Sequence, residues 1–98
     1  MTDMKEIISL LKSIPQIEFL GYINIDKYGF SRTIAFILRS VTYKIEWYSN
    51  ISYLYIGEVI IPFINIEHTN TYPHNYKSEL RFTITKDNAY FPVIIPVE

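Results

Sequence analysis

Several residue types that usually carry chemistry are scarce or missing in this chain. It has no cysteine, three glycines and two histidines in 98 residues. Without cysteine there is no disulfide scaffold, no thiolate zinc site and no cysteine nucleophile. Three scattered glycines do not build a phosphate-cradling loop or a Gly-x-Ser-x-Gly elbow. The sequence therefore excludes many catalytic and cofactor-binding motifs, and we expect no cofactor.

Neither charge nor apolar residues are concentrated in one stretch. The formal net charge is -1, and the lysines and arginines are spread along the chain. A protein that grips a phosphate backbone needs clustered positive charge, so nucleic acid is not the expected partner. Apolar runs such as residues 34–38 fall far short of the ~20 residues of a membrane-spanning helix. Residues 1–6 lack the layout of a signal peptide, and we expect a cytoplasmic protein without a membrane segment.

Apolar and aromatic residues are abundant instead. The hydrophobic fraction is 49%, the aromatic fraction 16% and the charged fraction 19%. Disordered chains are poor in aromatic and β-branched residues, so this composition favours a folded protein. The length fits one domain with one core. We therefore expect residues 1–98 to form a single domain.

The apolar pattern changes from helical to strand-like at Pro15. Between residues 3 and 14 the apolar residues fall on one helical face, and Asp3 with Glu6 resembles a capping box. Beyond Pro15 they recur with a period of two. Pro92 and Pro96 place the last strand at a sheet edge, because proline cannot donate to a ladder. The expected strands cover residues 16–25, 31–39, 41–48, 51–56, 59–66, 79–85 and 89–97.

This order of elements predicts the fold class. A helix followed only by strands with short connections is typical of an α+β fold with antiparallel pairing. We expect an N-terminal helix packed on a curved, mostly antiparallel sheet of six to seven strands, either open or barrel-like. Because Ser40 alone is too short for a turn between residues 39 and 41, we expect a bulge or one bent strand there.

Two of the expected strands are apolar on both faces. Residues 34–38 and 59–64 do not alternate, whereas a sheet with one wet face does. A helix of about twelve residues is only ~18 Å long and covers part of one face. The other face is therefore covered by closure of the sheet on itself, by a second copy of the chain or by a different protein.

Tyrosines and one polar segment are the strongest candidates for partner contacts. The chain has nine tyrosines, and tyrosine is enriched both in strands and at binding hot spots. Residues 68–78 (HTNTYPHNYKS) hold both histidines and form a long polar connection of the kind that often binds ligands. The candidate partner-binding residues are Tyr48, Tyr53, Tyr55, Tyr72, Tyr76, His68, His74, Glu46 and Glu58.

A catalytic interpretation of the same segment is the weaker alternative. His68 and His74, with Glu67 and Lys77, hold the ingredients of a metal-independent hydrolase. A zinc site needs three protein ligands, and only Glu67 or Glu79 could complete a set with the two histidines. Their spacing matches no catalytic signature, so we predict that the chain is not an enzyme and holds no metal.

We therefore expect a small protein-binding module that occludes the surface of a partner protein. Inhibitors, toxin-immunity proteins and anti-defence proteins act in this way. The alternative is a homo-oligomeric domain, such as a homodimer, that pairs with itself through a sheet face or edge.

Overall fold

The chain begins with one helix that ends before a proline. The computed structural model describes residues 4–25, 31–69 and 78–98, and α1 spans Met4–Ser13. The helix expected over residues 3–14 is confirmed, although Asp3 lies outside the described residues. Ile14 precedes Pro15, and the residue before a proline disfavours the helical conformation. No helix in the described ranges is long and apolar enough to cross a membrane.

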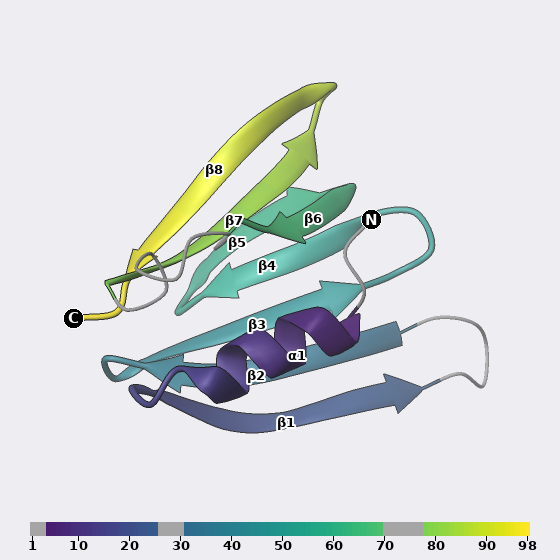
Figure 1. Cartoon of the computed structure of the whole chain (residues 1–98). Helices are drawn as coiled ribbons and strands as arrows, with labels where there is room; N and C mark the ends of the chain where they lie inside the picture. The colour runs from purple at the N-terminus through teal and green to yellow at the C-terminus, as the bar shows by residue number, and fades with distance from the viewer. Residues whose placement is uncertain (1–3, 26–30, 70–77) are drawn as a thin grey trace.

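Five strands form the larger of two sheets (Figure 1). They are β1 (Ile17–Ile25), β2 (Ser31–Leu38), β3 (Val41–Trp47), β4 (Ser52–Ile56) and β5 (Val59–Phe63). The spatial order is β1-β2-β3-β4-β5 and every pairing is antiparallel. Each strand therefore lies beside its neighbour in the sequence, as in a β-meander.

Three strands form the smaller sheet, in the order β6-β7-β8. They are β6 (Asn65–His68), β7 (Glu79–Lys86) and β8 (Ala89–Pro96). The single strand expected over residues 59–66 is wrong, because the chain changes sheets at Ile64. The N–H of Ile64 already donates to the carbonyl of Thr85 at 2.7 Å. The α+β class is confirmed, but the described residues form eight strands in two sheets, and these do not close into a barrel.

Tight turns join several of the strands. Arg39 and Ser40 both have positive φ, 53° and 65°, as the central residues of a type I′ turn require. The bulge or bent strand expected at Ser40 is therefore wrong. The same conformation recurs at Asp87 and Asn88, with φ of 51° and 62°. Gly57, with φ of 59°, begins the β4–β5 turn, at a position where a type II′ turn favours glycine.

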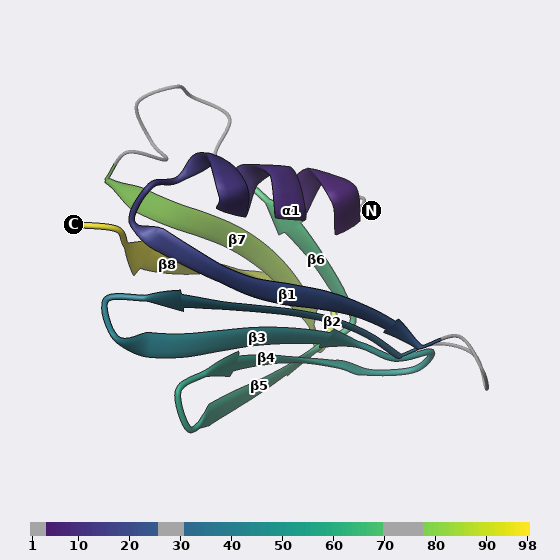
Figure 2. The ribbon, with the colours of Figure 1, turned by 90° about the horizontal axis from the view of Figure 1, so that it is seen from below.

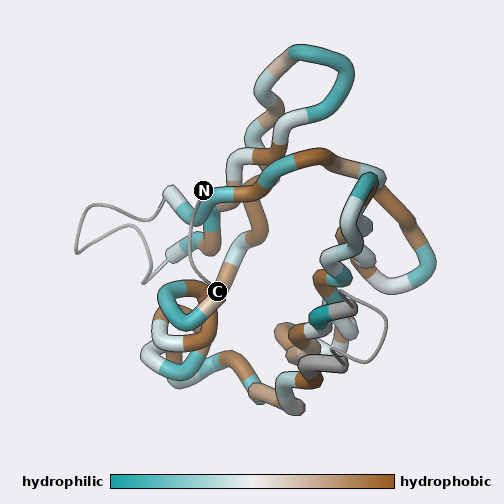
Figure 3. Tube along the Cα trace, turned by 90° about the vertical axis from the view of Figure 1, so that its right-hand side faces the viewer, coloured by the Kyte–Doolittle hydropathy of each residue, from teal (hydrophilic) through white to brown (hydrophobic). Residues whose placement is uncertain are grey.

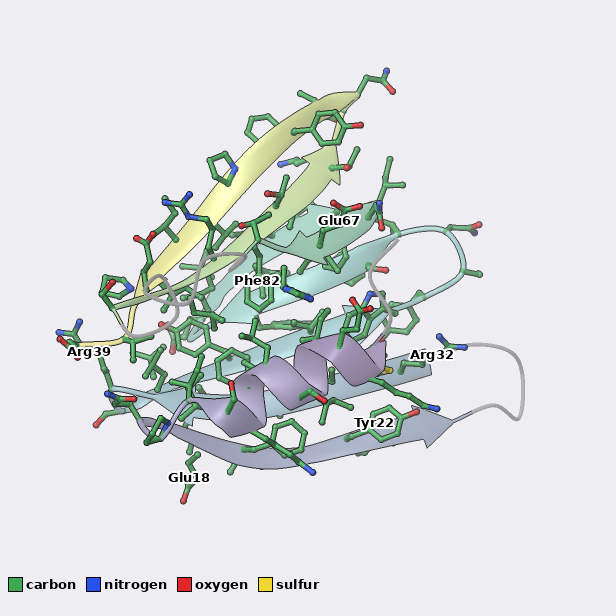
Figure 4. All side chains as sticks on the ribbon, viewed as in Figure 1. Glu18, Tyr22, Arg32, Arg39, Glu67 and Phe82 are labelled. Carbon is green, nitrogen blue, oxygen red and sulfur yellow. The ribbon has the colours of Figure 1, made fainter. Side chains whose placement is uncertain are left out.

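One hydrophobic core joins the helix and both sheets. Figure 2 shows that α1 and the β6–β7–β8 sheet lie on the same side of the larger sheet, and in Figure 3 the chain bends around this shared interior. Phe82 points into the interior while Glu18 points away from it (Figure 4). The fully buried side chains include Ile7, Leu11, Ile34, Phe36, Ile45, Leu54, Phe63, Leu80 and Phe82.

Prolines lie on two of the open sheet edges. β8 is an edge strand, as Pro92 and Pro96 predicted. The N–H of Val97 donates to the carbonyl of Ser78 at 2.9 Å, so hydrogen-bonded pairs alternate along this ladder with pairs whose N–H groups point outward. Pro92 and Pro96 occupy outward-pointing positions opposite Thr83 and Glu79. Each proline therefore removes a donor from the open edge and none from the ladder.

The remaining edges are also poor templates for another strand. Pro62 in β5 lies opposite Tyr53 and occupies an outward-pointing position by the same alternation, because Gly57 hydrogen-bonds to Thr42. β1 carries a register shift between Phe19 and Gly21, and such bulges twist an edge away from neighbours. β6 has only four residues. In the part of the chain that the structure describes, every sheet edge thus carries a feature that opposes edge-to-edge pairing.

Candidate functional site: a tyrosine cluster on the outer face of the larger sheet

The larger sheet has an outer face that no other described element covers. Lys44 and Glu46 of β3 alternate with the buried Tyr43 and Ile45 and so point away from the core. Ile60 of β5, opposite Tyr55, is on the same face and 56% exposed. The apolar residues on the two faces of the larger sheet therefore differ in how they are covered. The helix and the smaller sheet cover the inner face, whereas the described residues leave the outer face open (Figure 2).

Three tyrosines form a continuous aromatic surface on this outer face. Tyr53 and Tyr55 lie on β4 on either side of the buried Leu54, with ring centroids 6.5 Å apart. Tyr48, just beyond β3, meets Tyr53 edge to face at 6.0 Å. Such contacts are favourable aromatic geometries and restrict the rings. The prediction that Tyr53 and Tyr55 share a face opposite Leu54 is confirmed.

Glu46 lies among these rings and interacts with the phenols of Tyr48 and Tyr55. Burial, followed by the Glu46 carboxylate, raises the pKa of Tyr48, and interaction with the same carboxylate, followed by burial, raises the pKa of Tyr55. Lys44 completes the group, with its Nζ 3.7 Å from Oε2 of Glu46 and 4.3 Å from the centre of the Tyr55 ring. We call Tyr48, Tyr53, Tyr55, Glu46 and Lys44 the tyrosine cluster. The ring contacts restrict the three tyrosines before any partner arrives, which lowers the entropy lost on binding.

The backbone next to the cluster is held by a buried serine. Ser52, at the start of β4, is 3% exposed. Its Oγ accepts a hydrogen bond from the backbone N–H of Tyr48 at 3.2 Å. This contact spans the connection between β3 and β4, so it fixes Tyr48 relative to Tyr53 even though Tyr48 lies outside the strand.

The cluster predicts an altered titration of one tyrosine. The hydrogen bond to Glu46, followed by burial, raises the pKa of Tyr55 to about 12. A raised pKa means that the fold favours the neutral phenol, so this stabilisation is complete below about pH 10 and is lost as the pH rises towards 12. We expect Glu46→Gln to lower the Tyr55 pKa towards 10, because the neutral amide does not oppose the phenolate.

This titration can be followed in tyrosine ring NMR spectra, with Tyr55→Phe identifying the signal. Glu58→Gln removes a carboxylate from an exposed turn outside the cluster and is the matched control. The Tyr55 pKa should stay near its original value in that control. An unchanged Tyr55 pKa in Glu46→Gln would show that the carboxylate does not hold the phenol.

The other candidate contact residues do not join this cluster. His68 lies on β6 of the smaller sheet, where its Nε2 is 3.5 Å from Oε2 of Glu6 on α1. It faces a shallow hollow formed with Lys5, Glu6 and Ser9, on the helix side of the molecule. Glu58 lies in the exposed β4–β5 turn, and the contacts of the cluster described above do not include it.

The remaining predictions for residues 68–78 fall largely outside the described residues. Tyr72, Tyr76, His74 and Lys77 all lie there, so their roles as contact or catalytic groups stay predictions. Glu67 is exposed on β6. Within the described ranges, no group of three or more metal-binding side chains gathers at one place.

Sequence reasoning missed one member of the tyrosine cluster, Lys44, and one residue that positions the cluster, Ser52. Lys44 was not a candidate, although it alternates with Glu46 on the same face of an expected strand. Ser52 was not one either, because its role depends on the length of the preceding connection. A period of two along β3 could have identified Lys44, whereas the Ser52 contact needs the structure.

Comparison with known proteins adds no identification. No protein-family model, no curated protein and no solved structure matches this chain.

Proposed function

We propose that this chain is a small protein-binding module that acts by occluding the surface of a partner protein, as inhibitors, toxin-immunity proteins and anti-defence proteins do. The observation that carries the proposal is the tyrosine cluster on the uncovered outer face of the larger sheet. Tyrosines that are fixed in place supply large contact area at low entropic cost, and they are enriched at binding hot spots.

The character of the outer face supports a protein as the ligand. Beside the cluster, Ile60 is 56% exposed. Ile23 of β1 lies on the same outer face at the opposite edge of the sheet and is equally exposed. The outer face thus combines exposed apolar side chains with the charged groups of Glu46 and Lys44. A broad sheet surface of this mixed kind resembles a protein interface more than a small-molecule site, which is usually concave.

The guarded edges favour binding through a face. Proline on β5 and β8, the bulge in β1 and the shortness of β6 all oppose the addition of another strand. If the chain instead pairs with itself, which is the alternative function, these edges favour pairing through a sheet face over pairing through a sheet edge. In such face pairing, two copies would cover each other's outer faces.

The direct test is retention of a partner by immobilised chain in a lysate of the native host. We expect Tyr53→Ala to lower the affinity for a stoichiometric partner by about 30-fold or more, the loss typical of a hot-spot residue. Tyr90→Ala is the matched control, because Tyr90 is 78% exposed on β8 of the other sheet. It should leave the affinity unchanged.

Two outcomes contradict the proposal. A partner that is retained equally by Tyr53→Ala and by the wild type does not use the cluster. A chain that forms dimers in light scattering, and becomes monomeric when Tyr53 is replaced, uses the same face for self-association. The wild type should instead be monomeric at the concentrations used for binding.

A further inference from the structure

Glu46 retains unused hydrogen-bonding capacity at the centre of the tyrosine cluster. Only 16% of its side chain is exposed, so the residue is partly buried among its neighbours. A carboxylate offers ~four acceptor positions. The neighbouring donors in the cluster are the phenol hydroxyls of Tyr48 and Tyr55, whose pKa values this carboxylate helps to raise. A partly buried carboxylate favours additional hydrogen-bond donors.

Lys44 satisfies this demand only loosely. Its Nζ is 3.7 Å from the carboxylate oxygen, beyond the ~2.7–2.9 Å of a charge-assisted hydrogen bond. The lysine side chain is 39% exposed, and its stem is flexible. The same Nζ lies 4.3 Å from the centre of the Tyr55 ring. The protein thus places its own cation between a carboxylate and an aromatic face, but does not hold it tightly.

The position of Lys44 indicates which group of a partner fits here. A guanidinium is planar, is weakly hydrated, stacks on aromatic rings and donates two parallel hydrogen bonds to a carboxylate. An ammonium offers only a point charge. The rings of Tyr53 and Tyr55, tilted by 48° to each other, provide aromatic surface beside Glu46.

We propose that the tyrosine cluster binds an arginine side chain of the partner protein, which displaces Lys44 and contacts Glu46. The inference rests on the proposed function, because it names the group that the same face recognises. The argument is one of charge complementarity. Glu46 supplies the negative charge, the tyrosines supply aromatic surface, and Lys44 leaves for solvent without breaking a close hydrogen bond.

The proposal is tested with a small probe, so that no partner need be known. Nα-acetyl-arginine amide is titrated into the whole chain at fixed ionic strength, and the ring signals of Tyr53 and Tyr55 are followed by NMR. Nα-acetyl-lysine amide is the comparison. We expect saturable shifts at millimolar concentrations, with arginine bound about threefold or more tightly than lysine.

Two variants sharpen this result in opposite directions. Glu46→Gln should weaken arginine binding about tenfold or more, because it removes the charged acceptor. Lys44→Ala should strengthen it about two- to fivefold, because the competing cation is gone. Lys44 is exposed enough for its replacement to leave the fold intact, so the test does not depend on Glu46→Gln remaining folded.

The contradicting outcomes are equally specific. Equal binding of the two probes, or weaker arginine binding in Lys44→Ala, would overturn the inference. If the arginine probe fails while Tyr53→Ala still releases the partner, the proposed function stands and the arginine inference falls. If the probe binds as expected but no partner depends on Tyr53, the cation site stands and the proposed function falls.

Discussion

Phe36→Ala is expected to lower the free energy of unfolding by about 3–5 kcal/mol, the usual loss for a fully buried aromatic side chain. Phe36 is 0% exposed in β2, near the middle of the larger sheet. Its ring stacks on Tyr43 of β3, with centroids 5.0 Å apart and planes at 9°. Because a small domain has only ~5–15 kcal/mol of stability in total, this variant should be close to unfolding.

Urea unfolding followed by the fluorescence of Trp47 measures this loss, because Trp47 is the single tryptophan and packs against the core. Phe91→Ala is the matched control. Phe91 lies on the edge strand β8 and is 46% exposed, so its replacement should cost about 1 kcal/mol or less. A loss below about 1 kcal/mol for Phe36→Ala would contradict the described core.

Pro92→Val combined with Pro96→Val is expected to convert the chain to dimers and larger species. Both prolines lie at outward-pointing positions of β8. Valine restores two backbone donors to an open edge and favours the extended conformation. Because Tyr90 and Ile94 occupy the other outward positions and are exposed, the variant presents a complete row of donors beside apolar side chains.

Light scattering over a range of micromolar concentrations detects this association. Tyr90→Val is the matched control, since it places the same β-branched residue at an outward position that already has an N–H group. It should leave the mass unchanged. A double proline variant with the same mass as the wild type would show that proline does not guard this edge.

The parts of the fold that followed from the sequence are those with local causes. The amphipathic pattern before Pro15 predicted α1, and alternation predicted the strands. The prolines of β8 predicted an edge. The turn at Arg39 and Ser40 was missed because both residues adopt positive φ, a conformation common for asparagine or glycine and uncommon for arginine or serine. The break at Ile64 was missed because it depends on a hydrogen bond to Thr85, which is distant in sequence.

The candidate site divides in the same way. A period of two placed Tyr53 and Tyr55 on one face, because side-chain direction in a strand is a local property. The contact of Tyr48 with Tyr53 depends on how the chain returns from β3 to β4, which Ser52 fixes. His68 shared a polar segment with several tyrosines in the sequence, yet the structure pairs it with Glu6 of α1. Proximity along the chain therefore misjudged its neighbours.

The meander order of the strands also bears on how quickly the chain folds. Every hydrogen-bonded pairing in the described residues joins strands that are consecutive in the sequence. Each pairing therefore closes a short segment, and the entropy lost in loop closure is small. Sheet proteins with distant pairings fold slowly because they lose that entropy before gaining contacts. We therefore expect the strands that carry the tyrosine cluster to align early as neighbouring hairpins, and α1 and the smaller sheet to dock later.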